Sequence, residues 1–174
     1  MRHSKGFIRK VKKDEEKRRA LPPHTLTLSL DLSKKEHSVF VSDHTNRPIS
    51  RFKIPHSLEG INSLIIEAER IKEGLGYSHI TYFMEPTSHL WMNVANILEE
   101  NGLNYRLIHP LSLWRQREIA SYTYSKSDYR DAELINQLGT SLNFTSTQLP
   151  KEPIWIELEV LASEYQDVRE SKCL

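Results

Sequence analysis

Four acidic side chains occupy positions from which they could act together. Asp31 ends an alternating segment typical of a β-strand, and Glu85 ends a short apolar segment rich in strand-forming residues. Asp128 and Asp131 are three residues apart, which places them on one face of a helix. Strand ends in an open sheet face a common crevice. The sequence therefore predicts that the four carboxylates lie close together.

Carboxylates gathered in one crevice repel one another unless a cation lies between them. Acids in a first helical turn are favoured by the helix dipole, so Asp128 and Asp131 alone would indicate only a helix start. Asp31 and Glu85 adjoin apolar strands, where an unpaired carboxylate costs free energy. Oxygen-only ligands suit Mg²⁺ or Mn²⁺, and two such ions about 3.5–4 Å apart would serve in-line displacement at a phosphodiester. We therefore predict metal-dependent chemistry on nucleic acid.

Basic residues are interleaved with aromatic ones between positions 114 and 126, just before the acidic pair. Such a stretch can hold a nucleic-acid strand through phosphate contacts and base stacking, although in isolation it would be a solvated loop. Beside a metal site, we predict that it binds nucleic acid. The predicted contact residues, with one lysine after the first strand and one arginine on the acidic helix, are Lys34, Arg115, Arg117, Tyr122, Tyr124, Lys126 and Arg130.

The elements that must position these side chains follow from the periodicity of apolar residues. In the first strand, leucines fall on one face and polar residues on the other, which predicts a half-buried strand in an antiparallel meander. Gly139 is expected to close the last of these helices. The order of elements predicts an α/β fold with a mixed five-stranded sheet flanked by helices. The expected strands are 25–31, 36–42, 48–54, 79–85 and 103–108, and the expected helices are 58–75, 88–101, 111–120 and 128–138.

The two ends of the chain differ from this body, which spans residues 25–140. Residues 1–24 hold nine basic and three acidic residues, a net charge of +6, whereas the rest of the chain carries −5. Such a basic arm is either a solvated tail or a phosphate-binding segment. Residues 141–174 are expected to form a linker and a helix with an apolar stripe. That helix either packs on the core or, as we favour, starts a coiled coil in a homo-oligomer.

Composition excludes several other classes of protein. Of the 174 residues, 38% are hydrophobic and 27% are charged, which is typical of one globular domain. No apolar stretch approaches a membrane span and no secretory signal is present, so we expect a cytoplasmic protein. The single cysteine, Cys173, excludes a disulfide framework within one chain. The histidines lack metal-ligand spacing, and the glycine-rich and nucleophile motifs of nucleotide-binding proteins and hydrolases are missing.

Four short motifs, taken together, resemble the N-terminal domain of the DEDD insertion-sequence transposases. They are Leu30–Lys34, Met84–Thr87, His109-Pro110 and the most specific one, Lys126–Ala132. Their order and spacing are similar to those of the "one-ten" family, the bridge-RNA-guided recombinases. The resemblance covers about residues 25–140.

This resemblance implies a ribonuclease-H-like fold of the RuvC type. It also implies DNA substrates, a guide (bridge) RNA, an oligomeric assembly and a role in DNA transposition and recombination. Three positions depart from the family pattern: Ser29 and Ser88 stand where glycines are usual, and His109 where an asparagine is usual. None of these changes removes an acidic residue. By the resemblance, the catalytic and metal-binding tetrad is Asp31, Glu85, Asp128 and Asp131.

Members of the family continue through a coiled coil into a second domain that supplies a serine nucleophile. Here the sequence ends within what resembles the start of that coiled coil, so we expect strand exchange to need a further domain. The leading hypothesis is the RuvC-like domain of a transposase that binds Mg²⁺ or Mn²⁺ and nucleic acid. One alternative is a stand-alone structure-specific endonuclease of the Holliday-junction type. Another is a truncated, non-catalytic protein that binds nucleic acid or pairs with a full-length partner.

Overall fold

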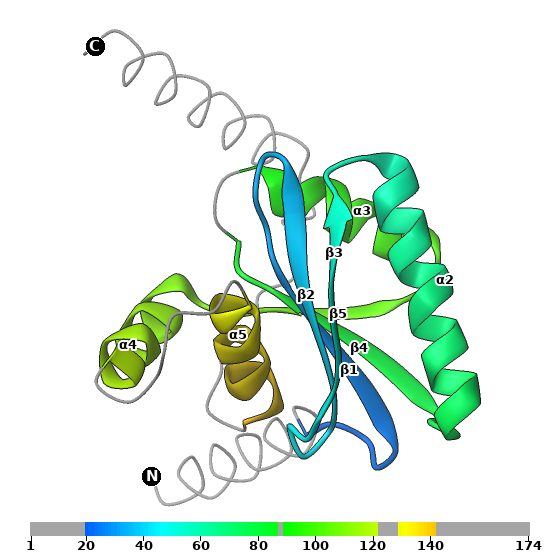
Figure 1. The fold of residues 1–174 in the computed structure, drawn as a ribbon, viewed down its shortest axis with the longest axis horizontal. Helices are drawn as coiled ribbons and strands as arrows, with labels where there is room; N and C mark the ends of the chain where they lie inside the picture. The colour runs from blue at the N-terminus through cyan, green and yellow to red at the C-terminus, as the bar shows by residue number, and fades with distance from the viewer. Residues whose placement is uncertain (1–19, 87–88, 122–128, 142–174) are drawn as a thin grey trace, which may run out of the picture.

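The computed structural model describes residues 20–86, 89–121 and 129–141. Within these ranges the fold consists of a five-stranded sheet and four helices (Figure 1). No helix in the described ranges is both long and apolar enough to cross a membrane. The strands are β1 (Thr25–Asp31), β2 (Glu36–Asp43), β3 (Pro48–Pro55), β4 (His79–Met84) and β5 (Asn104–Leu107), and the helices are α2 (Leu58–Leu75), α3 (Leu90–Glu100), α4 (Pro110–Ser121) and α5 (Arg130–Thr140).

Several predictions fall outside the described residues. The basic arm up to residue 19 and the linker and C-terminal helix from residue 142 onward are among them. So are Ser88 and four of the predicted site residues, which are Tyr122, Tyr124, Lys126 and Asp128.

The sheet combines an antiparallel half and a parallel half in the order β3-β2-β1-β4-β5. Strand β1 pairs antiparallel with β2, and β2 pairs antiparallel with β3, which is the expected meander. Strand β1 also pairs in parallel with β4, and β4 in parallel with β5. The predicted mixed five-stranded sheet is therefore confirmed, with β1 in its centre.

Helices cover both faces of this sheet. Helices α2 and α3 lie on one side and α5 on the other, with α4 beyond α5 at the margin of the domain (Figure 1). The larger core joins the β1 leucines to α2 and α3, for example through Leu28, Leu64 and Val94. The smaller core contains Phe83 of β4 and Ile135 of α5. Side chains alternate between these two cores along β4, as the pleat of a strand requires.

The prediction that β1 is half-buried is wrong. Thr25, Thr27 and Ser29, on the polar face, are all 0% exposed, because α5 covers this face. Their hydroxyl groups find partners inside the protein, as when Thr27 Oγ1 lies 2.8 Å from Ser42 Oγ. An alternating pattern therefore marks here a strand with one apolar and one hydrogen-bonded buried face.

Gly139 does not close the last helix as the sequence suggested. Helix α5 continues to Thr140, and Gly139 faces the buried ring of Phe83. A Cβ atom placed on Gly139 would lie 2.5 Å from ring carbons of Phe83. The glycine is needed for close approach of α5 to the sheet, which a local pattern cannot distinguish from a helix end.

We predict that Gly139→Ala destabilises the protein by about 1–3 kcal/mol, because the added methyl group overpacks α5 against Phe83. The matched control is Gly74→Ala in α2, where an added Cβ meets nothing within 4 Å. That change should be neutral or stabilise the helix by up to about 1 kcal/mol. Urea unfolding measures both variants, and equal effects would contradict the packing argument.

A buried histidine, His37, and its half-buried neighbour His56 hold the loop that follows β1. His37 is 0% exposed, and its Nδ1 accepts a hydrogen bond of 3.1 Å from the backbone N–H of Ser33. Its Nε2 lies 3.0 Å from His56 Nδ1. Because Nδ1 is an acceptor, the proton of neutral His37 is on Nε2 and is donated to His56. Burial, together with the nearby His56, lowers the pKa of His37 to about 4.

This lowered pKa predicts a loss of stability on acidification. The unfolded chain binds the His37 proton near pH 6.5, whereas the folded chain binds it only near pH 4. The free energy of unfolding should therefore fall between pH 7 and pH 5 by about 1–2 kcal/mol more than in His37→Gln. Urea unfolding at both pH values measures this difference. The same pH dependence in the variant would refute the assignment.

Candidate functional site

The structure brings Asp31 and Glu85 to the same edge of the sheet. Leu30 of β1 pairs with Met84 of β4 in the parallel ladder, so the next residues on the two strands are these two acids. Asp131 lies in the first turn of α5, which packs over this part of β1. Glu85 lies in the electrostatic field of Asp131 and Asp31, and Asp31 lies in that of Asp131. Three of the four predicted acids thus lie in one cluster.

Helix α5 is held in position by hydrogen bonds that cross from helix to sheet. The buried hydroxyl of Ser29 donates to the backbone carbonyl of Ala132 at 2.6 Å. At the middle of the helix, the Asn136 amide donates to Ser42 Oγ at 2.6 Å. The first of these contacts joins the residue after Asp131 to the strand that ends in Asp31. The Ser29 hydroxyl therefore links the two elements that carry these acids.

Burial makes this acidic group electrostatically unfavourable. Glu85 is only 9% exposed. Burial raises the pKa of the Glu85 carboxyl, Arg117 opposes this effect, and the neighbouring Asp131 and Asp31 add to it. Burial likewise raises the pKa of Asp31, Asp131 raises it further, and Arg117 opposes both. The site thus favours a nearby positive charge.

Arg117 supplies such a charge from α4. Its Nε lies 3.1 Å from Asp131 Oδ1 and its Nη2 lies 3.2 Å from Asp131 Oδ2. The same Nη2 lies 3.5 Å from Glu85 Oε2. Leu113, one helical turn earlier, is fully buried and turns this side of α4 toward α5. The guanidinium group therefore bridges two acids of the site.

The sequence suggested a nucleic-acid contact for Arg117, and its bridging position was not foreseen. The spacing of four residues between Leu113 and Arg117 carried a signal, since it places them on one helical face. The role of Ser29 was missed for another reason. Nothing near residue 29 in the sequence indicates that its partner is residue 132.

The other predicted nucleic-acid residues of the described ranges lie in the loop after Asp31 and on helices α4 and α5. Lys34 is exposed in the loop that follows Asp31. Arg115 is exposed on α4 next to Trp114, which is 53% exposed. Arg130 is half-buried at the first position of α5. The exposed pair on α4 presents one cation and one aromatic ring to solvent. Proteins that bind single-stranded nucleic acids use this combination of side chains.

The donor chemistry of the acidic edge fits a divalent cation. Asp31, Glu85 and Asp131 offer only oxygen atoms, the ligands that Mg²⁺ and Mn²⁺ prefer. Within the described residues, no group of three or more acidic, histidine or cysteine side chains is already arranged around a metal position. Arg117 holds both carboxylate oxygens of Asp131 instead. The side chains fit the ion by type and location, and would have to turn to bind it.

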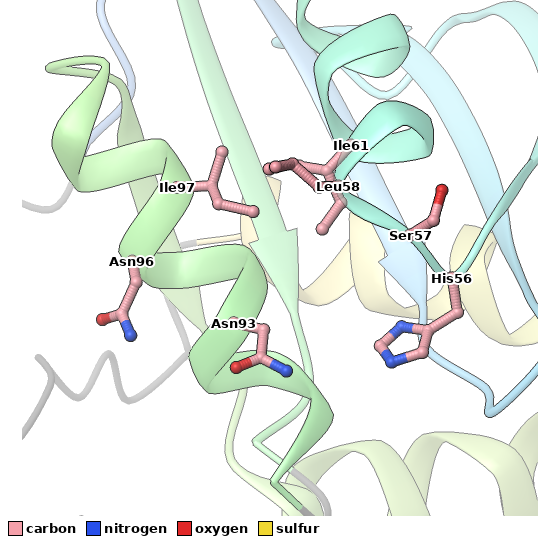
Figure 2. A pocket seen from close by; sticks show the side chains of 7 residues that line it. All are labelled: His56, Ser57, Leu58, Ile61, Asn93, Asn96 and Ile97. Atoms are coloured by element: carbon pink, nitrogen blue, oxygen red, sulfur yellow. The ribbon is translucent and has the colours of Figure 1, made fainter.

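A groove of about 330 Å³ lies at the same edge of the sheet, but on the face covered by α2 and α3. Figure 2 shows its lining, with the imidazole of His56 on one wall and the amide of Asn93 on α3 opposite; Asn96 of α3 also contributes. None of the predicted site residues lines it. The acidic edge and this groove are therefore separate features.

A mixed sheet with carboxylates after two adjacent parallel strands, beside an aspartate on a covering helix, defines an α/β domain of the ribonuclease-H-like type. A family model described as "Transposase", that of the DEDD transposases of the IS110 type, matches residues 28–172. The chain therefore belongs to this DEDD transposase family. No match to a curated protein was found. The family match also continues beyond residue 140 into the segment expected to contain the linker and C-terminal helix.

We predict that Ser29→Ala destabilises the protein by about 1–2 kcal/mol, because it removes a buried hydrogen bond between β1 and α5. The matched control is Ser63→Ala, which removes an exposed hydroxyl that donates to Gly60 within one helix. That control should change the free energy of unfolding by less than about 0.5 kcal/mol. Equal losses in both variants, measured by urea unfolding, would show that the contact between Ser29 and Ala132 contributes nothing specific.

Proposed function

We propose that this chain is the RuvC-like domain of a DNA transposase that binds Mg²⁺ or Mn²⁺ through Asp31, Glu85, Asp128 and Asp131. The observation that carries the proposal is the register between β1 and β4, which places two partly buried carboxylates side by side. Membership in the DEDD transposase family supports these four acids as the metal ligands of the chain. Asp128 would join them from the segment just before α5.

The energetics of the site support a bound cation. An ionised carboxylate as buried as Glu85 is costly unless a positive charge or several donors meet it. Arg117 meets this need only in part, since its contact with Glu85 is long at 3.5 Å. The Asp31 carboxylate is also desolvated by burial and repelled by Asp131. A divalent ion would relieve the repulsion among all these acids at once.

The proposed roles follow from position. Asp31 and Glu85 hold the ion from a rigid sheet, and Asp131 approaches it from α5. When bound, the ion would polarise a phosphodiester oxygen and favour ionisation of an attacking hydroxyl or water. Ser29 keeps α5 and its aspartate in register with β1 through its contact with Ala132.

The proposed substrates are nucleic acids. Lys34, in the loop after Asp31, and Arg115, on the same helix as Arg117, are exposed and would neutralise backbone phosphates, with Trp114 available for stacking. Arg130, Tyr122, Tyr124 and Lys126 belong to the same proposed surface by sequence. A guide RNA, assembly of several copies through the C-terminal helix, and a cytoplasmic location remain parts of the proposal.

Metal-dependent thermal stabilisation tests this function. At a tenfold excess of Mg²⁺ over its Kd, binding should raise the Tm of the wild-type chain by about 3–6 °C. Asp31→Asn should lose most of this shift, since it removes one charged ligand. Without metal it should be no less stable than wild type, because ionised Asp31 lies in an unfavourable site.

The control is Glu100→Gln, an exposed acid at the end of α3, which should keep the full metal-dependent shift. Mn²⁺ should give the same pattern as Mg²⁺, because both ions prefer oxygen ligands. Indistinguishable shifts in wild type and Asp31→Asn would exclude the proposed metal site.

A further inference from the structure

The guanidinium group of Arg117 is bound to the carboxylates that the proposed metal ion would need. It engages both oxygens of Asp131, at 3.1 and 3.2 Å, and reaches Glu85 Oε2 at 3.5 Å. A metal ion cannot bind the carboxylate oxygens through the lone pairs that already accept hydrogen bonds from this guanidinium group. The contact therefore bears directly on how a metal ion enters the site.

We propose that Arg117 is an internal counter-ion that competes with the divalent cation for Asp131 and Glu85. In the metal-free protein it neutralises the acids, and metal binding releases it from them. This inference rests on the proposed metal-binding function. It adds a residue from outside the acidic tetrad, and a coupling between metal binding and the position of Arg117.

The exposure of the pair makes this exchange feasible. The side chain of Arg117 is 37% exposed and that of Asp131 is 38% exposed. Ion pairs with this degree of solvent access are weak, because water competes for both charges. The pair is therefore weak enough for a divalent ion to displace it.

The placement of Arg117 on α4 allows its side chain to move without unfolding the domain. Leu113 anchors α4 in the smaller core, independently of the arginine head group. The helix lies at the margin of the domain, beyond α5, so the released side chain can turn toward solvent (Figure 1). The domain core does not depend on where this guanidinium group points.

The release has a consequence for substrate binding. A freed Arg117 would remain within one side-chain length of the metal site, and a guanidinium group is well suited to a phosphate group. The nucleic-acid contact predicted for Arg117 from the sequence would then be available only after metal binding. Metal binding would thereby free a guanidinium group that can bind a phosphate beside the ion.

A Mg²⁺ titration followed by thermal unfolding tests the competition on the full 174-residue chain. Ionic strength is held constant with KCl, so that screening does not change along the series. Arg117→Gln should lower the apparent Kd for Mg²⁺ by about three- to tenfold, because the competing cation is gone. The matched control, Arg47→Gln, removes the same charge from an exposed position in the β2–β3 turn, beyond the opposite end of β1, and should change the Kd by less than about twofold.

A second measurement observes the arginine directly and does not depend on the stability of a variant. In the wild-type chain labelled with ¹⁵N-arginine, the Nε–H of Arg117 should exchange with water more slowly than that of the exposed Arg47, since it donates to Asp131. Saturation with Mg²⁺ should shift this signal and accelerate its exchange. The signal is assigned by its disappearance in Arg117→Gln.

Asp131→Asn separates the two ideas. If neither wild type nor Asp131→Asn responds to Mg²⁺, the proposed metal site is wrong and the competition with it. If wild type responds and Asp131→Asn does not, but Arg117→Gln binds Mg²⁺ no more tightly than wild type, only the competition is wrong. An Arg117 Nε–H signal that stays unchanged at saturating Mg²⁺ would also overturn it.

Discussion

The parallel pairing of β1 with β4 is the constraint on which the rest of this structure depends. Its register places Leu30 beside Met84. The residues that follow them, Asp31 and Glu85, therefore lie at the same edge of the sheet. These strands lie in the centre of the sheet and are packed on both faces, so their ends cannot separate without loss of the core. Two negative charges are thereby fixed side by side in a partly buried place.

The other features of the site follow from this fixed repulsion. Helix α5 brings a third carboxylate, Asp131, and is held to β1 by the buried Ser29 hydroxyl. Helix α4 brings the opposite charge, since Leu113 turns Arg117 toward the acids. The central strands and α5 thus supply the negative charges of the acidic edge, and α4 at the margin of the domain supplies the positive charge. In the proposed exchange of Arg117 for a metal ion, the core would not need to rearrange.

Much of the fold could be predicted because its signals are local. The leucine alternation of 25–31, the helical stripe of 58–75 and the apolar segment before Glu85 gave strands and helices close to those observed. Predictions that depend on what covers an element were less accurate. Strand β1 is buried on both faces, and Gly139 lies within α5 against Phe83, because a helix packs there that the local sequence does not reveal.

The sequence by itself determined which acids follow which elements, and hence the family and the donor chemistry of the site. Residue type and spacing suffice for this, because strand ends and helix faces have fixed periods. Only the tertiary structure decided the partners of Ser29, His37 and Arg117, since each partner lies on another element of the chain. Contacts between distant segments depend on the packing of whole elements, and that packing sets the charge balance of the acidic edge.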